Sequence, residues 1–123
     1  MTASNPGQSG PPLSDHRTHG EWVYISGQIG REPDGRVPED FTRQAELAIQ
    51  ALRTQLEAAG SSLDRVIKTT VFITSAERYA VMNAVYARHF QEPWPTRSTL
   101  VTGLALPELQ FEIEAVGYRG DAR

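Results

Sequence analysis

An arginine and a glutamate are the side chains of this sequence best suited to chemistry. Arg97 lies in the stretch PTRST and Glu112 in FEIEA, and both stretches have the composition of β-strands. An ionised side chain in half-buried β structure costs free energy unless it has a partner or a ligand. The planar guanidinium can hold a small carboxylate through two parallel hydrogen bonds. The two residues are therefore either a structural ion pair between neighbouring strands, or a carboxylate clamp with an acid–base group beside it. Their spacing leaves both open.

Two weaker patterns add candidate binding residues. Ser26 and Gly27, in Ser26-Gly27-Gln28, come where a β-prone stretch meets a turn, and a glycine there permits close approach of a ligand. An ordinary turn explains the same pattern. Asn83 and Tyr86 are three residues apart and share one face of a predicted helix. The alternative is that Tyr86 belongs to the core and Asn83 is merely solvated.

Several classes of activity find little support. His16 and His19 point to opposite faces of an extended segment, with no Cys or acidic cluster nearby, so no metal site is expected. The sequence has neither a G-x-S-x-G elbow nor a phosphate-binding glycine loop, which disfavours covalent serine catalysis and nucleotide binding. A formal net charge of −3 gives no electrostatic footprint for nucleic acid.

The length of 123 residues predicts one domain, short for an enzyme that must enclose a substrate unaided, so a site shared between subunits is plausible. The absence of cysteine suits a reducing cytoplasm. The N-terminus does not resemble a secretory signal, and no stretch is long and apolar enough for a membrane span. Residues 1–12 are expected to be a flexible tail rich in Pro, Gly, Ser and Asn, and residues 13–120 the folded domain.

The periodicity predicts an α+β protein. Strands are expected at 21–26, 66–73, 98–101 and 109–118, with a further weak strand at 15–19. Apolar residues recurring at three and four predict a helix from Phe41, capped by Asp40 and stopped by Gly60. Ser75 can cap a second helix, which Pro93 and Pro95 end. This order suggests one mixed sheet with both helices on one face.

Alternation along the last strand then raises the question of the sheet's other face. It places Phe111, Ile113 and Ala115 on one side, and Glu112, Glu114 and Val116 on the other. A monomer exposes that second side to water, whereas an oligomer turns it inward around shared pockets. The sequence pattern leaves both possible.

Taken together, VYISGQIG, LEAAGSSLDRVIKTTVFIT, VMNAVYARHF, PTRS and FEIEA resemble the RidA/YjgF family of reactive-intermediate deaminases. The order and spacing of these five motifs match across roughly residues 13–118. The resemblance implies a chorismate-mutase-like mixed sheet with two helices on one face. It also implies a homotrimer with a central barrel and a pocket at each subunit interface.

The resemblance also implies roles for particular residues. By motif, the family's carboxylate-binding arginine falls on Arg97, and the glutamate that positions the attacking water falls on Glu112. The pocket-lining serine and glycine correspond to Ser26 and Gly27. Asn83 matches the asparagine of the N-x-x-Y helix, where Tyr86 completes the motif, and Thr99 stands where many members have cysteine. The implied activity is hydrolytic deamination of 2-enamino or 2-imino acids to 2-keto acids and ammonia, as by a 2-iminobutanoate/2-iminopropanoate deaminase, with no cofactor.

One departure qualifies that expectation. Family members carry a Pro-Tyr pair whose tyrosine reaches the pocket, whereas this chain has Pro12-Leu13. Tyr24 or Tyr86 then substitutes, or water fills the place, or the substrate differs. Trp94, near the expected pocket rim, can narrow substrate choice. The alternatives are a non-catalytic ligand-binding or regulatory trimer, and a deaminase for a pathway-specific substrate such as an aminoacrylate or an aromatic enamine. RNA cleavage, also attached to this family, is disfavoured by the acidic charge.

Overall fold

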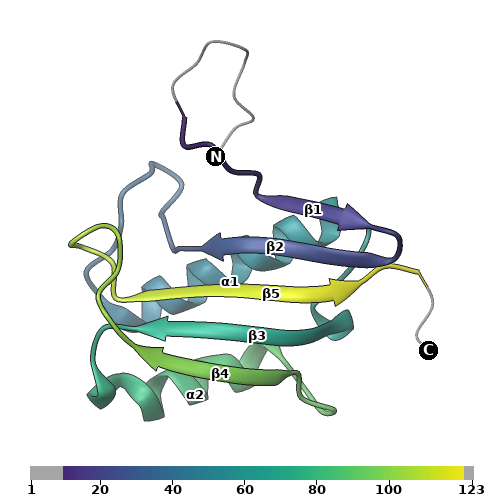
Figure 1. Ribbon diagram of the computed structural model, residues 1–123. Helices are drawn as coiled ribbons and strands as arrows, with labels where there is room; N and C mark the ends of the chain where they lie inside the picture. The colour runs from purple at the N-terminus through teal and green to yellow at the C-terminus, as the bar shows by residue number, and fades with distance from the viewer. Residues whose placement is uncertain (1–9, 121–123) are drawn as a thin grey trace.

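The structure is a computed structural model that describes residues 10–120, and it contains one five-stranded sheet (Figure 1). The strand order is β1-β2-β5-β3-β4. All neighbouring pairs are antiparallel except β3 and β4, which run parallel. The strands are β1 (His16–His19), β2 (Trp22–Gln28), β3 (Val66–Ile73), β4 (Thr96–Val101) and β5 (Phe111–Tyr118). Residues 1–9 of the predicted tail lie outside the described residues.

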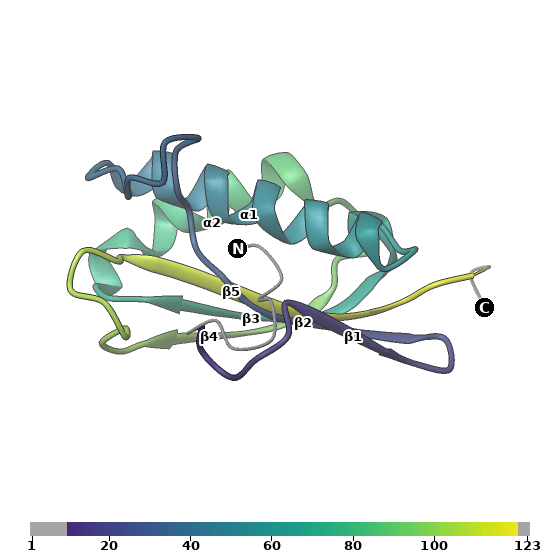
Figure 2. The ribbon, with the colours of Figure 1, turned by 90° about the horizontal axis from the view of Figure 1, so that it is seen from above.

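Both α-helices cover the same face of this sheet, which Figure 2 shows edge-on. Helix α1 (Phe41–Ala58) begins where the Asp40 side chain accepts a hydrogen bond from the Arg43 amide at 2.9 Å, so the predicted cap is confirmed. Gly60, with φ of +87°, follows its end. Helix α2 (Tyr79–His89) follows a 3-10 turn, Ala76–Arg78. Ser75 caps this turn rather than α2 itself.

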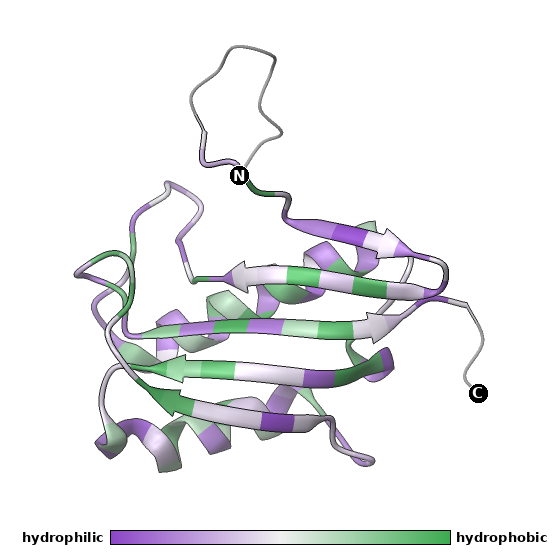
Figure 3. Cartoon of the chain, viewed as in Figure 1, coloured by the Kyte–Doolittle hydropathy of each residue, from purple (hydrophilic) through white to green (hydrophobic). Residues whose placement is uncertain are grey.

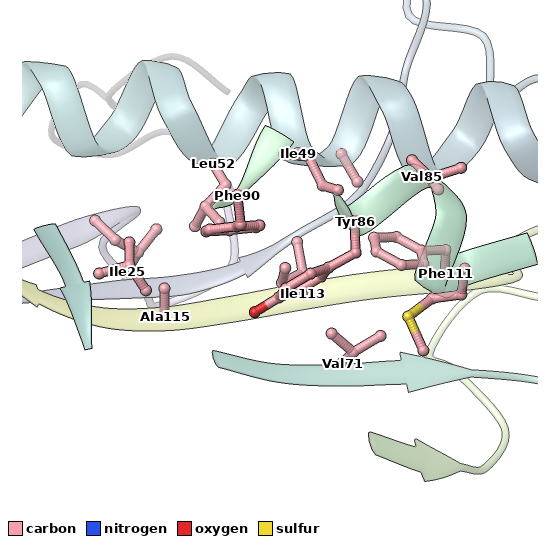
Figure 4. Close-up of a cluster of buried hydrophobic side chains, with 14 of the residues drawn as sticks. Ile25, Ile49, Leu52, Val71, Val85, Tyr86, Phe90, Phe111, Ile113 and Ala115 are labelled. Carbon is pink, nitrogen blue, oxygen red and sulfur yellow. The ribbon is translucent and has the colours of Figure 1, made fainter. Parts of the chain in front are cut away.

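The core lies between the helices and the sheet (Figure 4). Buried and more exposed residues alternate along β2 and β5, as the hydropathy colouring in Figure 3 also indicates. The residues of β5 that face the helices are Phe111, Ile113 and Ala115, so the predicted alternation is confirmed. The mixed α+β architecture with two helices on one face is confirmed with it.

Gln44 of α1 is a buried polar hub at one end of this core. Its side chain is fully buried, and its amide donates to the carbonyls of Pro38 and Glu108 at 2.8 and 3.0 Å. Its amide oxygen accepts from the Gln110 backbone at 2.9 Å. Three main-chain groups from two loops therefore depend on one side chain for a buried partner.

Two strand boundaries differ from the sequence prediction in a way that matters for function. Gly27 does not end β2, which continues to Gln28. Instead, the register with β5 shifts between Ile25 and Gln28, so that Ser26 and Gly27 form a β-bulge. The strand predicted at 98–101 begins at Thr96, which places Arg97 inside regular β structure.

Candidate functional site

Arg97 lies on β4, the edge strand that pairs with β3, and its side chain meets helix α2. The guanidinium carbon is 4.9 Å from the centre of the Tyr86 ring and 5.8 Å from that of Tyr79. One terminal nitrogen, Nη2, donates to the Tyr79 hydroxyl at 3.2 Å, and the other, Nη1, lies 3.8 Å from the Met82 sulfur. Aromatic rings and a thioether thus hold the cation.

No carboxylate within residues 10–120 forms a salt bridge with Arg97. A half-buried arginine without an acidic partner is poised to receive an anion, since its five N–H groups are mostly unused by the fold. The sequence left open whether this arginine has a structural partner. The structure leaves the guanidinium available.

Arg97 lines a pocket of ≈ 390 Å³ between α2 and the loop that leads into β4. Its other lining residues are Asn83, Tyr86, Ala87, Trp94 and Pro95. Tyr86 is only 5% exposed, and its hydroxyl shares a hydrogen bond of 2.8 Å with Thr69. Tyr86 therefore packs in the core (Figure 4), and its ring also lines the Arg97 pocket. Its role in binding a ligand stays a prediction.

Thr99 follows Arg97 by two residues and so projects from the same side of β4. It is half-buried, and its side chain makes no hydrogen bond within the described residues. Asn83 has no hydrogen-bond partner there either. Both side chains retain donors and acceptors for a ligand.

Glu112 belongs to a second group of candidate residues, on β2 and β5. A Cβ added at Gly27 would lie 1.9 Å from Oε2 of Glu112, so the carboxylate occupies the space that any side chain at position 27 would need. The β-bulge brings Ser26 to the same place, where its amide donates to the Asp15 carbonyl at 2.9 Å and its hydroxyl to the Ser14 carbonyl. Ser26, Gly27 and Glu112 are therefore brought together.

The environment of Glu112 favours its protonated form. Burial of the carboxyl raises its pKa above the ordinary value, and the negative charge of Glu114, two residues along β5, raises it further. A raised pKa brings a carboxyl closer to the range in which it can take and return a proton near neutral pH.

The two groups lie on opposite faces of the sheet. Arg97 contacts α2, on the helix side, whereas Glu112 alternates with the buried Ile113 and so lies on the helix-free face. Strand β3 separates β4 from β5, so an ion pair between neighbouring strands is excluded. Within one chain, the sequence-predicted site residues form two half-sites. One comprises Arg97, Asn83, Tyr86 and Thr99, and the other Glu112, Ser26 and Gly27.

Leu13 lies beside the second half-site. It is 55% exposed and lines a pocket of ≈ 760 Å³ together with Tyr24 and Ser26. Tyr24, 52% exposed, lies in that pocket and can present a phenol there, whereas the Tyr86 hydroxyl is bound to Thr69. Sequence reasoning missed Tyr79 as a site residue, although its spacing of seven from Tyr86 places both on one helix face.

Metal-binding clusters and membrane-spanning helices are both absent from the described part of the chain. His16 bonds to the Gln55 side chain at 2.7 Å, and residues 10–120 contain no group of three or more His, Asp or Glu side chains arranged to hold a metal. Over the same residues, no helix combines the length and apolar character needed to cross a bilayer.

Comparison with known proteins relates this geometry to a family. A family model described as "Endoribonuclease L-PSP" matches residues 5–118. The chain is 36% identical over 122 residues to "Putative reactive intermediate deaminase TdcF" of Escherichia coli strain K12, covering 96% of this chain and 94% of that protein. It is 35% identical over 100 residues to "Protein HMF1" of Saccharomyces cerevisiae, covering 80% and 78%.

Solved structures agree with the sequence matches. The crystal structure of Escherichia coli TdcF with bound serine aligns with a TM-score of 0.81 at 34% identity, covering 91% of each chain. RidA from an Antarctic Psychrobacter aligns with a TM-score of 0.81 at 36% identity, covering 90% of this chain and 91% of that one. The length matched and the level of identity are sufficient to conclude that the chain belongs to the RidA/YjgF family, which includes proteins named reactive intermediate deaminases.

Proposed function

We propose that this protein hydrolyses 2-imino acids, formed from their 2-enamino tautomers, to 2-keto acids and ammonia. The observation that carries the proposal is Arg97, a guanidinium held in a pocket by aromatic rings with no carboxylate partner among residues 10–120. Such a group binds a substrate carboxylate through its planar fork and so fixes the adjacent C=N carbon. The relationship to proteins named reactive intermediate deaminases supports the same assignment.

The chemistry needs one water and one proton relay. A water adds to the carbon of the protonated imine, Glu112 accepts a proton from that water, and the proton passes to nitrogen. The C–N bond then breaks as Glu112 accepts the proton of the adduct's hydroxyl group, which leaves a keto group and ammonia. Transfer of that proton to ammonia releases ammonium and restores the Glu112 carboxylate. Such acid–base assistance contributes about 10²–10⁴-fold to the rate. Gly27 and Thr99 would donate hydrogen bonds to the tetrahedral adduct. The Ser26 hydroxyl donates to the Ser14 carbonyl and so would accept a hydrogen bond from the adduct. No cofactor is required, because the protonated imine is already an electrophile.

The proposal requires two chains, because Arg97 and Glu112 lie on opposite faces of one sheet. We propose a homotrimer in which the β4 edge of one subunit meets the helix-free face of the next. Exposed apolar side chains on that face, including Trp22, Tyr24 and Ile67, support its being covered. Each pocket would then combine Arg97 of one subunit with Glu112 of its neighbour.

A mixing experiment tests the chemistry and the shared site together. Arg97→Lys and Glu112→Gln are each expected to lose most activity in an assay of ammonia release from enzymatically generated 2-iminobutanoate. Refolding the two variants as a 1:1 mixture should restore about a quarter of the wild-type activity, since random assembly pairs intact halves at that frequency. No recovery despite normal assembly would refute a site built from two subunits.

Binding provides the direct test of the carboxylate clamp. Lysine keeps the charge of Arg97 but loses the fork, so affinity for 2-oxobutanoate should fall about 10- to 100-fold. Arg53→Lys is the matched control, because Arg53 is an exposed arginine that pairs with Glu57 and does not line this pocket. Equal affinities of wild type and Arg97→Lys would disprove the proposed role.

A second candidate is a ligand-binding trimer without turnover. The apolar Leu13 beside Ser26 favours it, because no phenol is present at that position. This candidate predicts that 2-oxobutanoate binds in an Arg97-dependent manner while ammonia release stays at the spontaneous rate. RNA cleavage, suggested by the family model's description, should be assayed on the same samples. With a net charge of −3, we expect none.

The absence of cysteine accords with action in a reducing cytoplasm.

A further inference from the structure

The walls of the Arg97 pocket are mostly apolar once the groups that hold the carboxylate are set aside. Trp94, Ala87 and Pro95 line it beside the guanidinium. Trp94 is 49% exposed, so much of its indole is free to contact a ligand. The Tyr86 hydroxyl bonds to Thr69, which leaves the Asn83 amide and the Trp94 indole N–H as the other polar groups in the lining. A ligand anchored on Arg97 therefore has an aromatic and aliphatic wall beside its carboxylate.

The half-site around Ser26 presents an apolar contact of its own at Leu13, in a pocket that Arg17, Thr18 and His19 also line. Leu13 is 55% exposed in the pocket that also contains Tyr24 and Ile25. The segment bearing Leu13 is fixed there, because the Ser26 hydroxyl and amide bond to the carbonyls of the next two residues, Ser14 and Asp15. Leu13 is thus held next to the residues assigned to the reaction, where it can exclude water from one side of a ligand.

We propose that the physiological substrates are 2-imino acids with large apolar side chains, of the kind derived from leucine or phenylalanine, rather than those derived from alanine or serine. This inference rests on the proposed function for the site it describes. A pocket of ≈ 390 Å³ accommodates such a side chain. The ring or branched end lies against Trp94 of one subunit and Leu13 of its neighbour, while Arg97 holds the carboxylate.

The preference can be measured by binding as well as by turnover. Titration with 4-methyl-2-oxopentanoate, phenylpyruvate and pyruvate should show the two larger keto acids binding at least about 10-fold more tightly, since each buried methylene contributes severalfold discrimination. The imines generated from leucine, phenylalanine and alanine by an amino acid oxidase should give the same order of kcat/KM.

Two variants test whether Trp94 and Leu13 produce the preference for large apolar side chains. Trp94→Ala and Leu13→Ser should each reduce the ratio of leucine-derived to alanine-derived kcat/KM by about 3- to 10-fold. Both residues are exposed in the irregular part of the chain, so folding should persist. Leu106→Ser is the matched control, because Leu106 is also an exposed leucine but lies in the loop between β4 and β5. It should leave the ratio unchanged.

The possible outcomes distinguish failure of the proposed apolar preference from failure of the proposed deaminase activity. If all three imines are hydrolysed with equal kcat/KM, the apolar preference is overturned while the deaminase proposal stands. If the large keto acids bind preferentially but no imine is hydrolysed above the spontaneous rate, the pocket preference stands and the deaminase proposal fails. A ratio unchanged by either variant overturns the assignment of the corresponding wall.

Discussion

Replacing Gly27 with alanine is the sharpest test of how the Glu112 half-site is built. The added Cβ would lie 1.9 Å from Oε2 and 2.9 Å from the carboxyl carbon of Glu112. Carbon and oxygen atoms that are not bonded do not approach so closely, so one of the two groups must move. The backbone at Gly27 does not require a positive φ, and the obstacle is the far end of a flexible side chain. The carboxylate will move, and the strand will stay in place.

The displacement sets the expected loss of activity. Restoring an ordinary contact distance moves the carboxylate by at least about 1 Å, a misplacement that can lower a rate by about 10²-fold. We therefore expect Gly27→Ala to reduce kcat for 2-iminobutanoate about 100-fold. Its melting temperature should stay close to that of the wild type, because the three atoms nearest the new methyl group all belong to the Glu112 side chain.

Two other glycines provide matched controls in the same ammonia-release and thermal-unfolding assays. At Gly103, nothing lies within 4 Å of the added Cβ, so Gly103→Ala should change neither activity nor stability. At Gly30, the added Cβ would lie 2.2 Å from the backbone oxygen of Gln44, so Gly30→Ala should lower the melting temperature. If Gly27→Ala retains the wild-type kcat, the position of the Glu112 carboxylate does not matter for the reaction. If it unfolds as readily as Gly30→Ala, the packing argument is wrong.

Three further changes test charge, core and cation positioning. Burial and, to a lesser extent, the charge of Glu114 raise the pKa of Glu112, and Glu114→Gln removes the second cause. The acid limb of the kcat/KM–pH profile should therefore move to lower pH, and no movement would mean that Glu112 is not the titrating group. Gln44→Met removes the side-chain partner of one buried and two partly buried main-chain groups, so it should lower the free energy of unfolding by about 1–3 kcal/mol in urea titrations. A loss below about 0.5 kcal/mol would show that water replaces them. Tyr79→Phe removes the hydroxyl that accepts a hydrogen bond from Arg97, so it should weaken 2-oxobutanoate binding about 3- to 10-fold. In the Arg97→Lys background the same change should have no effect on binding, which a double-mutant cycle would show.

The raised pKa of Glu112 also has a consequence for stability. A carboxyl whose pKa is higher in the folded state binds more protons there than in the unfolded chain, so its contribution to stability is present at low pH. That contribution is lost as pH rises through the folded-state pKa. Ionisation of Glu112 therefore lowers the free energy of unfolding, a cost that the proposed catalytic role would explain.

The elements of the fold were predictable because their signals are local. The three-and-four spacing from Phe41 and the cap at Asp40 specify α1, and β-branched residues specify β3. Strand order was not predictable, because the parallel pairing of β4 with β3 depends on how α2 crosses the sheet. The β-bulge at Gly27 was missed for a similar reason, since its position depends on the register with β5.

Tyr79 shows the limit of periodicity at the site itself. It falls on the apolar stripe of α2 with Met82 and Tyr86, which predicts a core position. In the structure it is 48% exposed, because this part of the helix lies over the edge strand β4 and not over the middle of the sheet. The apolar stripe therefore identified the correct face of α2, but it could not reveal that Tyr79 on that face contacts the Arg97 guanidinium.

The arrangement of charges is what most directly argues for an anion between subunits. Arg97 is a cation without a carboxylate partner in the described chain, and Glu112 is a carboxyl whose surroundings resist its ionisation. Covering both groups in an assembly without a ligand would leave a charge desolvated and unpaired, which costs free energy. A substrate carboxylate on Arg97 removes that cost, while a protonated imine beside Glu112 favours the ionised carboxyl. A 2-imino acid carries both charges two atoms apart, so under the proposed function it would satisfy the two half-sites together in a way that a simple carboxylate would not.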